Sequence, residues 1–483
     1  MGNYIMVRLR KDGEIRFPPP SNTASRSDNM NKLLQKARMR ALDISPPIIV
    51  FISFFCIILL GAIILTLPVC SENGLPTSFI DALYTATSAT CVTGLIVFDT
   101  GDHWNWLGEI VVIALIQIGG LGLITLATFF MSILGRKSGI KSMMLAQESL
   151  NTFDWHDSVR LIRTVVVAVF VVEGIGAVLL SIAFVPQYGF KGVYFGIWHS
   201  ISAFCNAGFD VLGGLKSMGE YNGNPLVIYT ISGLIMLGGL GFIVWQDIWN
   251  YGKTRTLKIH TKIVLAISII LWLGGALFIF IVERGNANTL GRMPTAEAVN
   301  ASVFLSVNAR TAGYASFNLN AMSDVTKVFT SILMFIGAAS GSTGGGIKVN
   351  TFGVMLIAVF MVIRSRDNMV FQNRIIPIST ALKAFTVTFL SGVWLVTVTM
   401  LISLINPEFR LVNSLFESAS AFGTVGLSIG MTTSPDYGLA SKIIHILTMF
   451  IGRVGPMTFA ITLTFIGKKG GDIIYPEGKI VVG

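Results

Sequence analysis

The fold is decided by the stretch Ala86-Thr87-Ser88-Ala89-Thr90-Cys91-Val92-Thr93-Gly94-Leu95, because close relatives of this stretch return three times later in the chain. The later copies are Ser202-Ala203-Phe204-Cys205-Asn206-Ala207-Gly208-Phe209, Val307-Asn308-Ala309-Arg310-Thr311-Ala312-Gly313-Tyr314 and Ser420-Ala421-Phe422-Gly423-Thr424-Val425-Gly426-Leu427. In each copy a small residue precedes the last glycine and a large apolar residue follows it. These glycines recur every 105 to 114 residues, which is the period of one structural unit.

A second glycine-containing motif follows each copy of the first. Its four versions are Gly119-Gly120-Leu121-Gly122, Gly238-Gly239-Leu240-Gly241, Gly337-Ala338-Ala339-Ser340-Gly341 and Gly452-Arg453-Val454-Gly455. Two motifs that recur together in the same order four times predict a fourfold internal repeat. We place an N-terminal arm at residues 1–45 and the repeats at 46–135, 136–250, 251–365 and 366–483, the last including the C-terminal tail.

Composition predicts that the repeats lie in a membrane. The 483 residues are 53% hydrophobic and only 12% charged, and the mean hydropathy is +0.71, which leaves too little polar surface for a soluble globule of this length. The net charge of +10 does not predict nucleic-acid binding, because no RNA- or DNA-binding motif accompanies it. The four cysteines show no paired spacing, and no cleavable signal peptide is visible before the first apolar run near Pro47.

Eight apolar segments are long enough to cross a bilayer as helices, which takes about 20 residues. They lie at about 48–67, 108–134, 163–185, 226–249, 263–282, 327–363, 382–405 and 440–466. The predicted fold is therefore an all-α polytopic membrane protein with eight transmembrane helices, two in each repeat. Each copy of the first motif falls between the two helices of its repeat.

The segment before each copy is too short to cross. Residues 79–89 and 413–421, for example, would make a helix of roughly 15 Å, against a hydrocarbon thickness of about 30 Å. The chain must enter as a short helix and leave as an extended segment that carries the glycine. Such a re-entrant loop is tolerated where protein or water surrounds it, and a pore-lining loop meets this condition.

The distribution of positive charge predicts the topology. Of the 35 Lys and Arg residues, 25 lie in the arm, in 136–163, 251–262 and 364–383, and in the tail from 467 onward. Because Lys and Arg gather on the cytoplasmic side, these segments and both termini are expected in the cytoplasm. All four repeats then share one orientation around an axis along the membrane normal, which excludes inverted repeats.

The first motif has the chemistry of an ion selectivity filter. Rings of backbone carbonyls can replace the hydration shell of an alkali cation without a fixed negative charge, and glycine adopts the backbone conformation that this requires. The predicted filter residues are Cys91, Val92, Thr93 and Gly94; Cys205, Asn206, Ala207 and Gly208; Arg310, Thr311, Ala312 and Gly313; and Gly423, Thr424, Val425 and Gly426. The competing interpretation is close helix packing at small residues. Because a cation at Arg310 would repel the substrate, we expect its side chain behind the filter, bonded to carbonyls or an acid.

These motifs resemble those of the Trk/Ktr/HKT superfamily of potassium transporters, and most closely the bacterial Ktr membrane (ion-translocating) subunits of the KtrB type. The resemblance covers about residues 45–483, and its most specific pieces include residues 88–99, 310–314, 421–427, 451–456 and Tyr475-Pro476-Glu477-Gly478. It implies potassium uptake across the cell membrane, a homodimer, and control by a cytoplasmic nucleotide-binding ring (KtrA-like). The family's filter glycines correspond to Gly94, Gly208, Gly313 and Gly426.

The third repeat departs from the others in its second helix, where Gly337, Ala338, Ala339, Ser340, Gly341, Ser342, Thr343, Gly344, Gly345 and Gly346 interrupt the apolar run. Five glycines in this stretch disfavour helix, so an irregular loop at membrane depth is expected, with a kinked helix as the alternative. The resemblance implies an intramembrane gate here. Arg453 follows its filter glycine by as many residues as Ser340 follows Gly313, so the two should lie at one depth, and we predict that Arg453 and the loop form the gate.

Other functions fit the sequence less well. No catalytic constellation predicts an enzyme, no arginine-striped helix predicts a voltage-gated channel, and the histidines show no metal-ligand spacing, so potassium is the only metal expected. An ion-coupled secondary transporter and a sodium- and potassium-permeable channel of the same fold stay open as alternatives. No cofactor is expected in this chain, whose substrate is potassium with sodium left open. Because no nucleotide-binding motif is present, nucleotide control requires a separate subunit.

Overall fold

A computed structural model describes residues 46–122, 158–365, 369–372 and 374–455. The chain divides into two units, residues 1–45 and 46–483, and all the described residues belong to the second. The predicted N-terminal arm, the C-terminal tail and the predicted helix ends at 123–134 and 456–466 lie outside the described residues.

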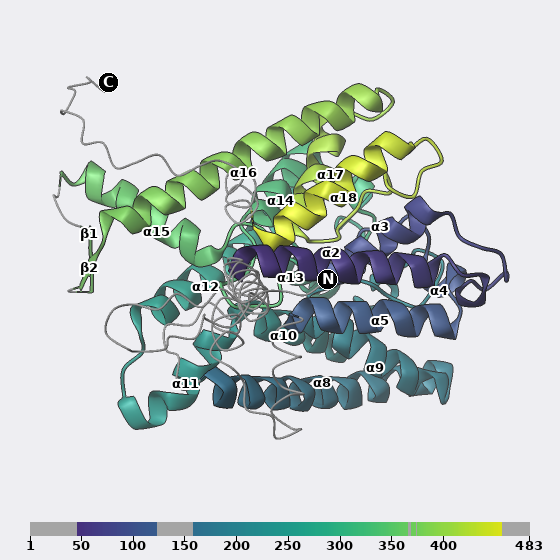
Figure 1. The fold of residues 1–483 in the computed structure, drawn as a ribbon, viewed down its shortest axis with the longest axis horizontal. Coiled ribbons are helices and arrows are strands. Elements are labelled where there is room, and N and C mark those ends of the chain that lie inside the picture. The colour runs from purple at the N-terminus through teal and green to yellow at the C-terminus, as the bar shows by residue number, and fades with distance from the viewer. Residues whose placement is uncertain (1–45, 123–157, 366–368, 373, 456–483) are drawn as a thin grey trace, which may run out of the picture. The chain divides into compact units, whose positions relative to one another are not determined.

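Within the described residues, four single helices are long and apolar enough to cross a membrane, and each is the first described helix of one of the four predicted repeats. They are α2 (Pro46–Leu65), α8 (Ser158–Tyr188), α12 (Ile259–Glu283) and α16 (Ile378–Ile405). After each comes a short helix: α3 (Phe79–Thr90), α9 (Lys191–Phe204), α13 (Thr295–Asn308) and α17 (Leu411–Gly423). A further helix then follows: α5 (Trp106–Leu121), α10 (Pro225–Leu240), α14 (Asp324–Phe335) and α18 (Leu439–Val454). In Figure 1 the colour of the ribbon follows these helices in chain order, from α2 in purple to α18 in yellow.

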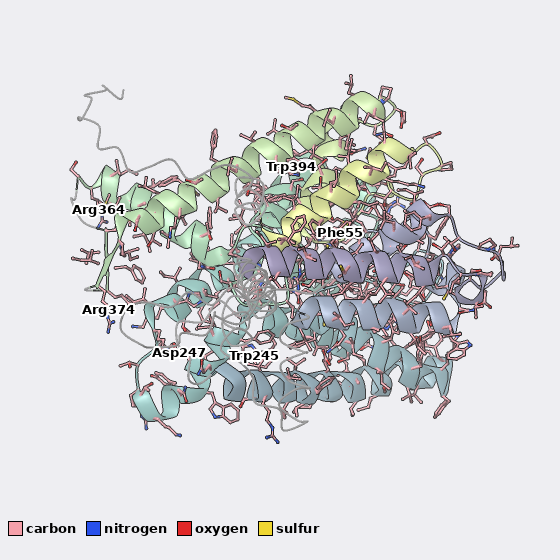
Figure 2. The ribbon with its side chains drawn as sticks, in the orientation of Figure 1. Phe55, Trp245, Asp247, Arg364, Arg374 and Trp394 are labelled. Carbon is pink, nitrogen blue, oxygen red and sulfur yellow. The ribbon has the colours of Figure 1, made fainter. Side chains whose placement is uncertain are left out.

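The remaining elements are small or extend the third helices. They are α4 (Thr100–His103), α11 (Phe242–Thr254), α15 (Val349–Ile363), the 3₁₀ turns η1 (Pro68–Cys70), η2 (Gly219–Tyr221) and η3 (Leu319–Ala321), and the strands β1 (Met369–Phe371) and β2 (Arg374–Ile376). The two strands pair antiparallel, with Val370 opposite Ile375. Arg374 is the first residue of β2, Arg364 lies close to the hairpin, and Asp247 lies on α11 (Figure 2).

The short helices are present as predicted. They contain 12 to 14 residues, which corresponds to about 18–21 Å of helix and is too short for a bilayer. The start of α3 is capped by Ser78, whose hydroxyl accepts a hydrogen bond from the Asp81 N–H. Lys442 of α18 also donates to Asp81, at 2.6 Å, and this ion pair joins the first short helix to the last helix.

The second glycine motif is explained by packing against the short helices. A Cβ on Gly119, Gly238 or Gly452 would collide with the backbone carbonyl oxygen of Thr90, Phe204 or Phe422, at the end of the short helix of the same predicted repeat. Only glycine allows the two backbones to approach this closely. The last glycine of the motif ends α5, α10 and α18 with φ values of 81°, 87° and 97°, which side chains rarely adopt.

The predicted helix at 226–249 is not one straight span. It consists of α10 and α11, which meet at an angle of 93°. Gly241 lies at the bend, and the N–H of the next residue, Phe242, donates to Gly341 O at 2.9 Å rather than continuing α10. The motif at 238–241 could not by itself distinguish a helix that ends from one that bends.

The predicted interruption of the third repeat is confirmed. Helix α14 ends at Phe335 and α15 begins at Val349, and a non-helical loop separates them. The inner faces of the helices form two large apolar clusters around the short helices. The outer faces expose apolar side chains such as Phe55 of α2, which is 51% exposed (Figure 2). Such a surface suits lipid better than water.

Candidate ion-conduction site

The four glycine segments, residues 91–94, 205–208, 310–313 and 423–426, form a closed ring. A Cβ on Gly94 would lie 3.3 Å from the Cα of Gly208, and a Cβ on Gly208 would lie 2.7 Å from the Cα of Gly313. The same distances are 3.1 Å from Gly313 to Gly426 and 2.9 Å from Gly426 back to Gly94. Each glycine therefore lies beside the glycine of the next segment, and the fourth segment returns to the first.

One backbone carbonyl of each segment faces the ring. The oxygens belong to Thr93, Ala207, Ala312 and Val425, all of which are fully buried. Each oxygen abuts the glycine of the preceding segment so closely that any Cβ there would collide with it. Among the described residues, none of these four oxygens accepts a hydrogen bond. They are free to bind something else.

The segments keep these carbonyls free because their N–H groups point the other way. The N–H groups of Thr93, Ala207, Ala312 and Val425 donate to carbonyls of Ser88, Ser202, Asn308 and Ser420 at 2.7–3.0 Å. The hydroxyls of Ser88 and Ser420 also accept the Gly94 and Gly426 N–H groups, each at 3.0 Å. Asn308 accepts the Tyr314 N–H in the same manner, at 3.0 Å. Donors thus return to the short helices while acceptors face the ring.

The backbone conformation repeats in all four segments. The ring glycines have φ values of 94°, 70°, 80° and 90°, and Val92, Asn206, Thr311 and Thr424 also have positive φ, between 49° and 74°. Left-handed conformations at non-glycine residues cost free energy and persist only where the surroundings enforce them. The short helices end one to three residues before these residues, so their partly negative C-termini converge on the ring. We use "inner end" for the side of the ring on which these non-glycine residues lie.

The loop between α14 and α15, residues 336–348, lies at the inner end and is held by α10, by α18 and by a hydrogen bond within itself. The Ala339 N–H donates to Gly239 O of α10 at 3.0 Å. The Gly346 N–H donates to Gly452 O of α18 at 3.2 Å, and within the loop the Gly337 N–H donates to Ile347 O at 2.9 Å. Non-helical backbone inside a membrane requires such partners.

Three basic side chains donate to carbonyls of this loop. Arg310 donates to Gly337 O at 2.8 Å, Lys348 to Gly344 O at 2.6 Å, and Arg453 to Thr343 O. Arg453 also donates to Gly119 O at the end of α5. None of the three forms a salt bridge with a carboxylate in the part of the chain that the structure describes. Carbonyls released from helix pairing therefore stabilise the buried Arg310 and the half-buried Lys348 and Arg453.

Most sequence-predicted site residues come together here. All four glycine segments lie in the ring, and Arg453 contacts the loop at 337–346. The Arg310 side chain leaves the ring and bonds a carbonyl, as expected. Sequence reasoning missed the roles of Ser88, Ser420 and Asn308 as acceptors, although Ser88 and Ser420 each precede their glycine by six residues in the quoted motif copies.

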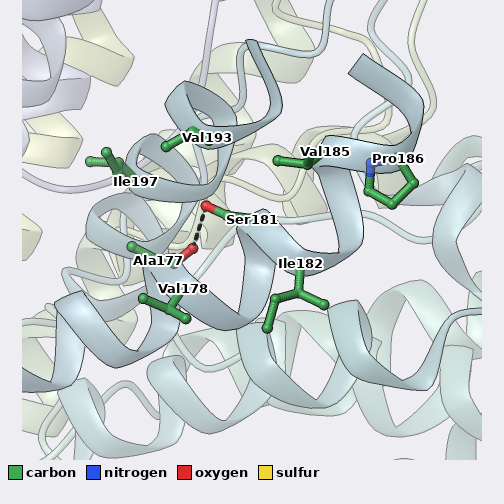
Figure 3. A pocket seen from close by; sticks show the side chains of 8 residues that line it. All are labelled: Ala177, Val178, Ser181, Ile182, Val185, Pro186, Val193 and Ile197. Atoms are coloured by element: carbon green, nitrogen blue, oxygen red, sulfur yellow. Dashed lines mark hydrogen bonds between the residues drawn. The ribbon is translucent and has the colours of Figure 1, made fainter. Parts of the chain in front are cut away.

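In the described residues, neither the pocket nor the metal-ligating residue types suggest a second ion site. An apolar pocket of about 500 Å³ lies between α8 and α9 and is lined by Val178, Ile182, Val193 and Ile197 among others (Figure 3). Val178 and Ile182 are 61% and 59% exposed, so the pocket opens to the outside of the helices rather than to the ring. Within the described ranges no group of His, Cys, Asp or Glu residues could hold a metal ion.

The fold and the ring define a helical membrane protein in which four short helices end at one ring of backbone carbonyls. The chain belongs to the TrkH family of cation transport proteins, whose match spans residues 29–469. Its outer apolar helices agree with a membrane location.

Curated relatives cover almost the whole chain. The potassium/sodium uptake protein NtpJ of Enterococcus hirae is 38% identical over 93% of this chain and all of the relative. The Ktr system potassium uptake protein B of Bacillus subtilis is 39% identical over the same shares. Among solved structures, the potassium transporter TrkH from Vibrio parahaemolyticus matches with a TM-score of 0.67 at 17% identity, over 87% of this chain and 86% of the other.

Proposed function

We propose that this chain takes up potassium and that the ions pass through the ring of glycine segments, which acts as the selectivity filter. The observation that carries the proposal is the set of four unbonded carbonyl oxygens, one from each segment. Relatives named as potassium or potassium/sodium uptake proteins support this choice of ion.

The chemistry of the ring suits a weakly bound monovalent cation. Carbonyl oxygens replace water around the ion, and the converging helix C-termini favour positive charge. The four segments contain no carboxylate, so nothing in them would hold a divalent cation tightly. Sodium stays a candidate second ion, because one relative is named for both ions.

The loop at 337–346 and Arg453 are proposed to close the path at the inner end. The loop lies directly against the filter, and the positive charges of Arg453 and Lys348 would repel a potassium ion there. Opening requires the loop to leave the carbonyl and amide partners that now hold it.

The proposed assembly has four parallel repeats, at 46–135, 136–250, 251–365 and 366–483, with eight spans and both termini in the cytoplasm. A homodimer with a cytoplasmic nucleotide-binding ring is proposed to control it. Relatives named as parts of a Ktr system support a multi-component assembly, and the basic segments predicted in the cytoplasm are the proposed contacts.

Uptake of radioactive rubidium into proteoliposomes that contain the purified chain tests the proposal. A negative internal potential should drive uptake, and external potassium should compete better than sodium. Uptake no greater than that of empty vesicles would contradict transport. Equal competition by both ions would favour the unselective channel, and a strict requirement for a sodium gradient would favour the coupled transporter.

A further inference from the structure

Three consecutive residues of the loop contact two of the glycine segments and the residue directly before a third. Thr343 donates its hydroxyl to Phe204 O at 3.2 Å, directly before the second segment. A Cβ on Gly344 would collide with the hydroxyl of Thr311 in the third segment, and a Cβ on Gly345 would collide with the hydroxyl of Thr424 in the fourth. Thr343 is completely buried. The loop thus forms the floor of the ring as well as lying across the path.

The residues it contacts are the strained ones. Thr311 and Thr424 have φ values of 74° and 49°. Asn206, whose φ is 61°, shares a side-chain hydrogen bond of 2.9 Å with Thr311, so the second and third segments are joined at this depth. With the Asn206 amide turned to satisfy its buried neighbours, its nitrogen donates to Phe204 O, the same carbonyl that Thr343 bonds. The loop and two segments therefore share one hydrogen-bonded cluster.

The first segment is the exception. Among the described residues, no hydrogen bond and no close glycine contact joins the loop to Val92, whose φ of 57° matches the other strained positions. Support from the loop is thus unequal around the ring, and removing the loop would relax three segments and leave the first unchanged.

We propose that Thr343, Gly344 and Gly345 determine ion specificity, because they hold the inner ends of three segments in the conformation that selects potassium. This inference rests on the proposed function. It implies that the gate and the filter are one mechanical element, so that release of the loop admits ions and lowers discrimination among them. Thr343 is a positioning residue, since it acts through Phe204 O.

The decisive variant is Thr343→Val, which keeps the shape of the side chain and removes the hydroxyl donor. Thr343→Ser keeps the donor. Thr330→Val is the matched control, because Thr330 is fully buried in α14 and its hydroxyl has no hydrogen-bond partner among the described residues. The readout is the ratio of the apparent affinities for potassium and sodium. It is measured by calorimetry on the purified protein, and by the ratio of rubidium to sodium flux in proteoliposomes.

We expect Thr343→Val to lower the potassium-to-sodium ratio about fivefold, equivalent to about 1 kcal/mol. Thr343→Ser and Thr330→Val should retain the wild-type ratio. If the loop only obstructs the path, Thr343→Val should instead raise the rubidium and sodium fluxes by the same factor. That result would overturn the inference. If a variant no longer supports flux, the ratio of its potassium and sodium affinities, measured by calorimetry, distinguishes the two outcomes.

Gly94→Ala separates the two proposals. If Gly94→Ala changes the ratio and Thr343→Val does not, the filter stands and the inference fails. If neither variant changes the ratio, the ring is not a filter and the proposed function fails with it.

Discussion

Replacement of Gly94 with Ala tests whether the ring selects ions, and the chain offers a matched control. Gly94 has a φ of 94°, and Gly74 has a φ of 68°. A side chain at either position would pay the cost of a left-handed conformation, about 1–2 kcal/mol. A Cβ at position 94 would in addition collide with Ala207 O, whereas nothing lies within 4 Å of a Cβ at position 74. Only the first substitution displaces a carbonyl of the proposed filter.

The displacement should affect selectivity more than folding. Moving one of four carbonyls weakens the coordination of a bare potassium ion, while a smaller or partly hydrated sodium ion depends less on that oxygen. A loss of about 1.4 kcal/mol in the preference for potassium corresponds to a tenfold lower ratio. We therefore expect about a tenfold drop in the potassium-to-sodium uptake ratio for Gly94→Ala, a drop at least as large for Gly94→Ser, and no change for Gly74→Ala.

The assay is rubidium and sodium uptake into proteoliposomes at equal protein content, with gel filtration to confirm that each variant remains folded. A wild-type ratio in folded Gly94→Ala would refute the reasoning. An equal drop in Gly74→Ala would do so too, because the effect would then follow from backbone strain alone.

Three further predictions follow from other contacts. Arg453→Ala, or deletion of residues 341–344, removes the contact of Arg453 with the loop and should raise potassium flux several-fold in the same vesicles. Wild-type flux and wild-type regulation in both variants would contradict the proposed gate. Asp81→Asn leaves Lys442 without its charged partner, which should cost about 3 kcal/mol of stability and lower the melting temperature of the purified protein. Asp324→Asn is the control, because Asp324 forms an exposed pair with Arg410, and it should cost less than about 1 kcal/mol. Equal shifts of the melting temperature in the two variants would contradict a structural role of the Asp81–Lys442 pair. The purified chain alone should show no response of flux to added nucleotides, and a full response would show that no separate regulatory subunit is needed.

The sequence predicted the parts of the fold that depend on length and on glycine. A segment of about ten residues cannot cross a bilayer whatever its neighbours are, so the short helices could be predicted without tertiary information. The interruption at residues 337–346 could be predicted because several glycines in succession disfavour helix in any context. The depth shared by Arg453 and the loop followed from the repeat spacing alone.

The parts of the structure that could not be predicted depend on which hydrogen-bond partner each group finds in the folded chain. Ser88 and Ser420 are small residues on short helices, and such residues serve close packing as often as hydrogen bonding. Lys348 follows the loop directly, yet its bond to Gly344 O depends on how the loop folds back. The bend at Gly241 arises because Gly341 O, a hundred residues away, accepts the Phe242 N–H. No local pattern contains that information.

Two positions at which the predicted repeat is broken lie together in the structure, where the gate is proposed. Within the second motif, Arg453 occupies the place of Gly120 and Gly239 in the first and second repeats. In the predicted third repeat the loop interrupts the corresponding helix, and these two departures from the repeat contact each other through Thr343 O. Arg453 also reaches Gly119 O, so it joins the end of α5 to the loop and connects the predicted first and fourth repeats. A single guanidinium with several donors can hold the loop between two helix ends. In the proposed function, the ring that recurs four times would act as the filter, and the two departures from the repeat that contact each other would act as the gate.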